Sequence, residues 1–212
     1  NGLCAAKEAG KWGYINQHGD WEIPAKFDRA HPFRENRAQV TFNGFVRFID
    51  RSGNFISEDK YQRAGDFQGG YAWIYAGGRY GYVASDGSVA VMPAFTEAKG
   101  FQHGLAVVRS KGKYGLIDNS GAFVLPARYN EISTFAEGIA SFRSGERWGL
   151  VDTTGNVVVK PRFDAVQPFQ EGLAAVQKGR RWLFIDKFGE QAFDGSFSAV
   201  KSFSEGRCAV KS

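Results

Sequence analysis

Residues 104–138 read GLAVVRSKGKYGLIDNSGAFVLPARYNEISTFAEG, and this stretch decides the fold. Three short runs rich in β-branched, aromatic and aliphatic residues follow one another at 105–109, 114–117 and 122–126. Turns that contain Gly112 and Gly121 separate them. Short apolar runs between glycine turns are typical of antiparallel strands joined by tight hairpins. The stretch therefore predicts a three-stranded antiparallel meander.

The same pattern recurs every 34 residues, and four columns of equivalent positions show it. One phenylalanine column consists of Phe33, Phe67, Phe101, Phe135, Phe169 and Phe203. A second aromatic column consists of Phe27, Tyr61, Phe95, Tyr129, Phe163 and Phe197. The glycine columns are Gly19, Gly53, Gly87, Gly121, Gly155 and Gly189, and Gly2, Gly70, Gly104, Gly138, Gly172 and Gly206, with Asn36 in the one gap. Columns kept without insertion or deletion indicate a tandem repeat.

The chain is thus interpreted as one repeat domain over residues 1–212. Copies 1 to 6 occupy approximately residues 1–34, 35–68, 69–102, 103–136, 137–170 and 171–204, and residues 205–212 start a further copy. Because no window of suitable length has helical spacing free of Gly or Pro, no long helix is expected. Pro24 and Pro126 lie late in the third run, which predicts a strand at a sheet edge, since proline cannot donate to a ladder.

The two aromatic columns are predicted to form the structural core, because an isolated meander is too small to be stable in water. Each buried ring would remove roughly 150–250 Å² from water. We expect the copies to form an open, curved array. Both ends of the chain carry the same strand, and three strands are fewer than the four of a typical propeller blade. A closed, propeller-like toroid is the alternative.

Composition and motifs exclude several classes of site. The 212 residues include 43% hydrophobic residues, enough for a core, and only two cysteines, too few for a disulfide framework or a Cys-rich zinc site. His18, His31 and His103 fall at three different repeat positions, so no metal site is expected. No phosphate-binding, dinucleotide or hydrolase motif occurs, so we expect neither a cofactor nor an enzyme. A hydrolase that uses two carboxylates from distant strands is the alternative, although no pair stands out in the sequence.

The sequence also has no segment expected to enter a membrane, because no apolar run approaches the roughly 20 residues that a spanning helix needs. The first ten residues lack the basic and then apolar pattern of a signal peptide. A reducing cytosol, the cell envelope and a secreted location all fit two free cysteines, so the sequence leaves the compartment open.

One column of basic residues, with the aromatic column beside it, is the candidate binding site. The basic residues are Lys11, Arg79, Lys113, Arg147 and Arg181. The adjacent aromatic residues are Trp12, Tyr80, Tyr114, Trp148 and Trp182. Neighbours along a strand point to opposite faces, so one row can be exposed while the other is buried. The cationic row either meets an acidic partner or is a solvated rim that protects strand edges.

The residues after the first turn carry a family resemblance. They read KWGYI at 11–15, RYGYV at 79–83, KYGLI at 113–117 and RWGLV at 147–151. With the Gly-Leu-Ala run and the Asp-x-x-Gly turn, the chain resembles the WG-repeat family of bacterial β-repeat proteins. The resemblance implies an all-β repeat architecture and a role in recognition, and it implies no catalytic residues. Val46-Arg47 and Trp182-Leu183 depart from the Trp-Gly pattern.

Three functional hypotheses follow. The first is a non-catalytic scaffold that binds a protein or peptide. The second is a binder of an anionic polymer, such as nucleic acid, cell-wall polymer or acidic glycan, through the basic and aromatic columns. The third and weaker one is binding of neutral glycans on exposed tryptophan rings. Copies 2 and 3, which depart from the consensus, are either specialised for a partner or the result of drift in a redundant array.

Overall fold

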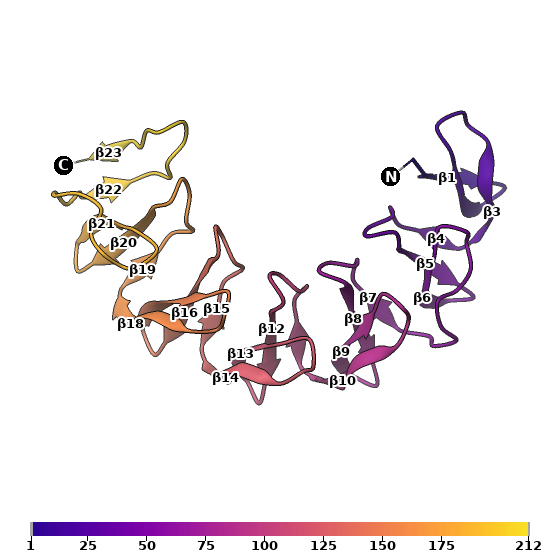
Figure 1. Cartoon of the computed structure of the whole chain (residues 1–212), viewed down its shortest axis with the longest axis horizontal. Helices are drawn as coiled ribbons and strands as arrows, with labels where there is room; N and C mark the ends of the chain where they lie inside the picture. Colours follow the sequence, from indigo (N-terminus) through magenta and orange to yellow (C-terminus); the bar gives the residue numbers. More distant parts are fainter. Residues whose placement is uncertain (1, 212) are drawn as a thin grey trace. The chain divides into compact units, whose positions relative to one another are not determined.

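The computed structural model describes residues 2–211, which are built from short strands and turns (Figure 1). Among these residues there is no α-helix, as predicted, and no helix that could cross a membrane. The chain divides into two compact units. The first comprises Asn1–Gln102 with Asn119–Gly121, and the second comprises His103–Asp118 with Ala122–Ser212. The main division lies between copies 3 and 4.

The first unit contains three antiparallel sheets, one for each copy. Sheet 1 contains β1 (Cys4–Glu8), β2 (Lys11–Ile15) and β3 (Trp21–Phe27). Sheet 2 contains β4 (Arg29–Ala30), β5 (Ala38–Phe42) and β6 (Phe45–Ile49). Sheet 3 contains β7 (Arg63–Ala64), β8 (Tyr71–Ala76), β9 (Arg79–Ala84) and β10 (Val89–Phe95). The short β11 (Glu97–Ala98) is the last strand of the first unit in chain order.

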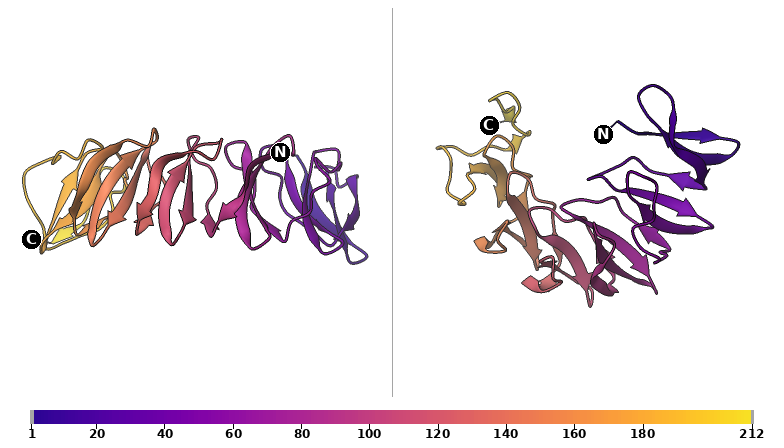
Figure 2. Two further views of the ribbon diagram at one scale, coloured as in Figure 1. Left: turned by 90° about the horizontal axis from the view of Figure 1, so that it is seen from below. Right: turned by 45° about the vertical axis from the view of Figure 1, so that its right-hand side comes forward.

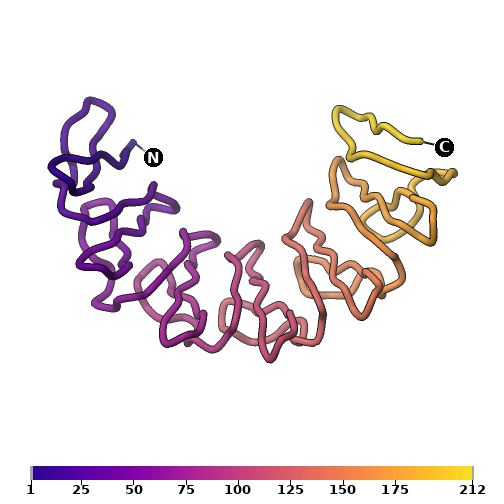
Figure 3. The backbone as a smooth tube through the Cα atoms, turned by 180° about the vertical axis from the view of Figure 1, so that it is seen from behind, coloured from indigo at the N-terminus to yellow at the C-terminus, as the bar shows by residue number. Residues whose placement is uncertain are grey.

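The second unit repeats this plan, and its backbone follows a similar course through strands and turns in each copy (Figures 2 and 3). Copy 4 provides β12 (Ala106–Ser110), β13 (Lys113–Ile117) and β14 (Phe123–Tyr129). The next sheet contains β15 (Glu131–Ile132), β16 (Ile139–Ser144), β17 (Arg147–Asp152) and β18 (Val157–Phe163). It is followed by β19 (Ala165–Val166), β20 (Ala174–Lys178) and β21 (Arg181–Ile185), and by the pair β22 (Ala199–Val200) and β23 (Val210–Lys211).

A short fourth strand, which the sequence pattern did not predict, joins the predicted meander. After the third strand the chain crosses to the next copy and pairs with the first strand there, as Arg63 does with Tyr75 and Glu131 with Arg143. The sheets of copies 3 and 5 therefore have four strands. Four strands are also the number in a typical propeller blade, so strand number does not distinguish an open array from a closed toroid, and the open array stays a prediction.

The glycine of the Trp-Gly pair is required because the third strand passes close above it. A Cβ atom at Gly13 would lie 2.3 Å from the carbonyl oxygen of Ile23, and one at Gly149 would lie 2.5 Å from that of Val159. Both obstacles are backbone atoms, which cannot rotate away as a side chain can. The register of each second and third strand pair shifts at this point. The glycine therefore permits an irregular, close strand pair.

The two copies without this glycine lack the third strand. In copy 2 only the isolated bridges Val46–Tyr61 and Ile49–Phe55 remain, and in copy 6 only Trp182–Phe197 and Ile185–Gln191. In copy 2 the buried Arg47 side chain fills the space. Its guanidinium lies 3.6 Å from the centre of the Phe55 ring and donates a 2.6 Å hydrogen bond to the carbonyl of Ser57. The middle of the strand is thereby replaced by a loop.

The aromatic columns lie in the cores of both units. In the Phe33 column Phe33, Phe67, Phe101 and Phe169 are buried, and Phe135 and Phe203 are half-buried. In the Phe27 column only Phe197 is not fully buried. Aromatic rings from neighbouring copies are in contact, for example Tyr129 with Phe142, whose ring centres lie 4.6 Å apart. Within each unit, neighbouring copies thus bury aromatic rings against each other, as Phe27 and Phe42 also do in the first unit.

Candidate functional site

The five basic side chains of the predicted column are exposed at the start of second strands. Lys11 Nζ lies 2.6 Å from Asp28 Oδ1, Arg147 forms an ion pair with Asp164, and Arg181 donates to the backbone carbonyl of Ser196. The side chains of Arg79 and Lys113 have no polar partner in residues 2–211. The column is therefore a row of partly neutralised charges and not a continuous basic stripe.

The carboxylates that neutralise this row also hold hairpin turns. Asp28 accepts hydrogen bonds from Lys11 and from the backbone N–H of Gly44, and these bonds hold the pKa of its carboxyl below the ordinary value. Asp164 likewise accepts a 2.7 Å hydrogen bond from the N–H of Gly179. These ion pairs therefore stabilise hairpins of the chain itself, and their presence does not require a binding partner.

The aromatic column lies half-buried at the margin of the cores, and basic side chains from the opposite strand lie over three of its five rings. Lys7 lies 5.9 Å from the ring centre of Trp12, Arg109 lies 5.4 Å from that of Tyr114, and Arg143 lies 5.8 Å from that of Trp148. Each of these cations is the direct cross-strand partner of its ring. The ring faces are therefore partly occupied from within the chain.

A more distinctive site surrounds Trp73, in the first unit. Trp73 lies on β8 at a repeat position held elsewhere by Ala5, Gln39, Val107, Ser141 and Ala175. The indole fits because position 65 is glycine: a Cβ atom there would lie 2.1 Å from Trp73 Nε1. Two hollows, of about 430 and 360 Å³, share Trp73 as a wall.

Polar side chains line the larger hollow. They include Arg29, His31, Gln39, Gln62 and Arg63. Arg63 is fixed, because its guanidinium lies 4.3 Å from the ring centre of Tyr75 and donates to the Tyr80 hydroxyl at 3.1 Å. The Oε1 atom of Gln39 is buried and has no hydrogen-bond partner within the described chain. An acceptor without a partner beside an aromatic wall suits a ligand that brings its own donor.

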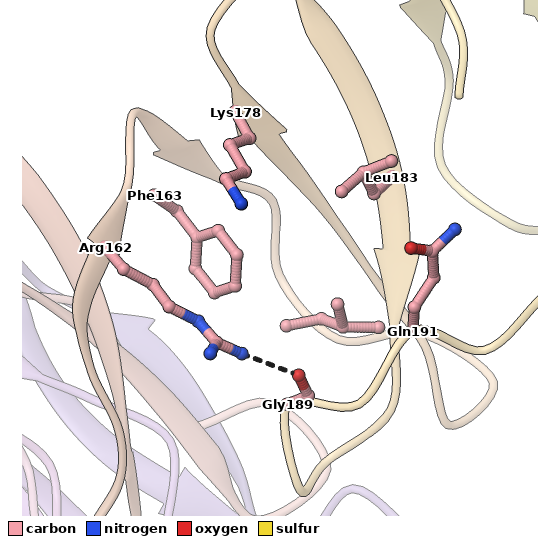
Figure 4. A pocket seen from close by; sticks show the side chains of 7 residues that line it. Arg162, Phe163, Lys178, Leu183, Gly189 and Gln191 are labelled. Atoms are coloured by element: carbon pink, nitrogen blue, oxygen red, sulfur yellow. Dashed lines mark hydrogen bonds between the residues drawn. The ribbon is translucent and has the colours of Figure 1, made fainter. Parts of the chain in front are cut away.

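Figure 4 shows a smaller hollow of about 200 Å³ between copies 5 and 6 of the second unit. Leu183, which replaces the Trp-Gly glycine, lies on one side of it, and Lys178 and Gln191 flank it. Arg162 closes another side by donating a 2.8 Å hydrogen bond to the carbonyl of Gly189. This contact ties two copies together, so we assign the hollow to packing.

The Trp73 hollows and a second exposed feature were not predicted from the sequence. Four apolar residues at the starts of third strands are 38 to 44% exposed: Trp21, Val89, Phe123 and Val157. They are 34 or 68 residues apart, so the repeat itself could have revealed them. The signal for the hollows was Trp73 outside the Trp-Gly column, together with Gly65 and Gly100 at positions where other copies have no glycine.

The histidines and cysteines differ in exposure. Residues 2–211 contain no group of three His, Cys, Asp or Glu side chains that could hold a metal ion. His18 and His103 are exposed, as expected, but His31 is half-buried at the larger hollow. Cys4 and Cys208 are free thiols, one in each unit.

Comparisons with known proteins address the family and the fold. The family described as WG containing repeat matches at residues 12–44, 47–80, 80–114, 114–148, 148–182 and 184–212. No curated protein matches the chain. A solved eukaryotic initiation factor is 10% identical, with a TM-score of 0.55, over 93% of this chain and 63% of its own. Hsv2p of Kluyveromyces lactis is 11% identical, with a TM-score of 0.48, over 88% of this chain and 71% of its own.

At these identities the initiation factor shows a likeness of fold alone. The family matches, in contrast, cover most of the chain and follow the 34-residue period that the strands display. The chain belongs to the WG containing repeat family.

Proposed function

We propose that this repeat chain is a non-catalytic interaction scaffold that recognises a protein or peptide segment. The observation that supports this proposal most is the pair of hollows on either side of Trp73. The larger has about 430 Å³, within the range of roughly 300–1,000 Å³ typical of ligand sites. Most of its residues come from copy 2, with Arg29 and His31 from copy 1 and Trp73 from copy 3.

The lining of this hollow matches the chemistry of a peptide. The indole of Trp73 offers an apolar wall for a side chain, and the amides of Gln39 and Gln62 can bond both donors and acceptors of a backbone. Arg29, which is exposed at the rim, can pair with a carboxylate. Tryptophan and arginine are also the residue types that contribute most to binding energy in protein interfaces.

The test is selection of a peptide from a displayed random library, followed by titration calorimetry with the purified chain. Trp73→Val should weaken binding at least about tenfold, since it removes a hot-spot side chain. Valine is the residue at the equivalent position 107, so this change is compatible with the repeat. Trp21→Gln, which alters an exposed tryptophan on another sheet, is the matched control. Selected peptides that bind Trp73→Val and Trp21→Gln equally well would contradict the proposal.

The anionic-polymer hypothesis is weaker, because carboxylates of the same chain, Asp28 and Asp164, neutralise Lys11 and Arg147. The formal net charge is only +5. Its test is the salt dependence of binding to heparin or DNA, where each neutralised phosphate adds nearly one unit to the log–log slope. A steep slope abolished by Arg79→Ala and Lys113→Ala would favour the polymer over the peptide.

A further inference from the structure

Each copy ends its long connection in a two-residue turn with an unusual backbone. The two central residues both have positive φ, for example 48° and 63° at Glu35 and Asn36, and 50° and 84° at Glu137 and Gly138. The residues that flank each turn bond to each other in both directions, as Ala136 and Ile139 do at 2.9 and 3.0 Å. This closure leaves the two central N–H groups free to bond elsewhere.

In two other copies a glutamate from the preceding copy occupies both of these N–H groups. Glu35 accepts from Gly69 and Gly70 at 2.8 Å each, one bond to each carboxylate oxygen. Glu137 accepts in the same way from Glu171 and Gly172 at 2.7 Å each. The turn is therefore a two-pronged carboxylate receptor, and charge-assisted bonds of this kind are stronger than neutral ones.

The turn at Glu137 and Gly138 has the same backbone but lacks this ligand. The residue at the clamping position of the preceding copy is His103. Its ring lies edge-on to Phe135, with centres 6.1 Å apart, and it supplies no carboxylate. Within residues 2–211 the N–H groups of Glu137 and Gly138 have no hydrogen-bond acceptor.

We infer that the turn at Glu137 and Gly138 binds a carboxylate of a partner protein, an Asp or Glu side chain. The turns at Gly69–Gly70 and Glu171–Gly172 show that this backbone binds a carboxylate at 2.7–2.8 Å. The partner's carboxylate takes the place that the chain's own glutamate takes in those copies. This site does not depend on the Trp73 hollows, because none of their residues contributes to it.

The test is a titration of the ¹⁵N-labelled chain with an acetylated hexaglutamate peptide, followed by the amide resonances of residues 137 and 138. Both should shift saturably with this peptide and should not shift with the matched hexaglutamine peptide. The amides of Gly69, Gly70 and Gly172, which are already bonded, serve as internal controls and should stay in place.

His103→Glu should fill the site from within the chain. The backbone of His103 has φ of 52°, close to the 48° of Glu35, so glutamate fits there. In this variant the two amides should move downfield without peptide, and the affinity for hexaglutamate should fall at least about tenfold. His103→Gln, which brings no charge, should bind hexaglutamate as the parent chain does.

Three results would overturn the inference. One is that residues 137 and 138 do not respond to hexaglutamate in the parent chain. Another is that His103→Glu binds the peptide as tightly as His103→Gln. The third is that inorganic phosphate or chloride shifts the two amides as strongly as hexaglutamate at equal concentration, which would indicate a non-selective anion effect.

Discussion

Replacing Gly115 by alanine tests why four of the six copies have a glycine directly after the tryptophan or tyrosine of the Trp-Gly pair. A Cβ atom at this position would lie 2.6 Å from the carbonyl oxygen of Leu125, and 2.8 and 2.9 Å from the N and Cα atoms of Ala127. Ordinary contacts begin near 3.4 Å, so β14 must retreat by most of an ångström. The backbone of Gly115 does not have positive φ, so crowding is the only penalty.

The expected loss of unfolding free energy is about 3 kcal/mol. Overpacking of a tightly packed site costs roughly 1–3 kcal/mol. Each hydrogen bond lost between β13 and β14 adds about 1 kcal/mol. Urea unfolding followed by tryptophan fluorescence measures the loss, and amide exchange at residues 123–129 should show that this strand opens first.

Gly112→Ala is the matched control, because it adds the same methyl group to the same hairpin at a position that has positive φ and no crowding. Gly112 has φ of 78° and no neighbouring atom within 4 Å of a Cβ, so alanine there is strained without being crowded. Its cost should be about 1 kcal/mol. If Gly115→Ala costs no more than Gly112→Ala, the explanation of the Trp-Gly motif by close strand approach is wrong.

Three other outcomes are expected. Phe27→Ala should cost about 3–5 kcal/mol in urea unfolding, because it opens a cavity in the core of the first unit; a loss below about 1 kcal/mol would contradict the assignment of its column to the core. The Asp28 carboxyl should titrate below the ordinary aspartate pKa of about 3.9 in a ¹³C NMR titration. The bond from Lys11 therefore stabilises the fold at pH values above the ordinary aspartate pKa, and this stabilisation is lost as the pH falls through the lower pKa of Asp28 in the folded protein. Lys11→Met should raise the midpoint of the Asp28 titration. Small-angle X-ray scattering should give an elongated envelope for the predicted open array, whereas a compact disc would favour the toroid.

Much of the fold was predictable because it repeats. A glycine with positive φ at Gly121 and a buried ring at Phe27 each recur with the same spacing, so local rules could be checked against several copies. The turn aspartates behave as such rules expect: Asp50 accepts from the N–H groups of Ser52 and Asn54 at 2.9 Å. Period and turn chemistry therefore fix the strands of a regular copy.

The short fourth strand escaped prediction because two residues such as Arg63 and Ala64 carry no periodic signal. The loss of the third strand in copy 2 also depends on tertiary contacts, since residues 55–61 match the apolar pattern only in part. The Arg47 side chain fills the place where a neighbouring backbone would lie.

The candidate site was harder to predict than the fold. The basic column was visible in the sequence, but its ion pairs join residues 17 apart, as in Lys11 and Asp28, and these follow only from the turn geometry. The Trp73 hollows depend on small residues at Gly65 and Gly100, whose effect appears only when the copies pack.

Amide hydrogen exchange, read by mass spectrometry along the whole chain, tests most directly the claim that the Trp-Gly glycine determines whether a copy has a third strand. Protection should be high at the four third strands, residues 21–27, 89–95, 123–129 and 157–163. It should be low in the middle of 55–61 and 191–197, where only isolated bridges remain. Equal protection of all six segments would contradict the claim.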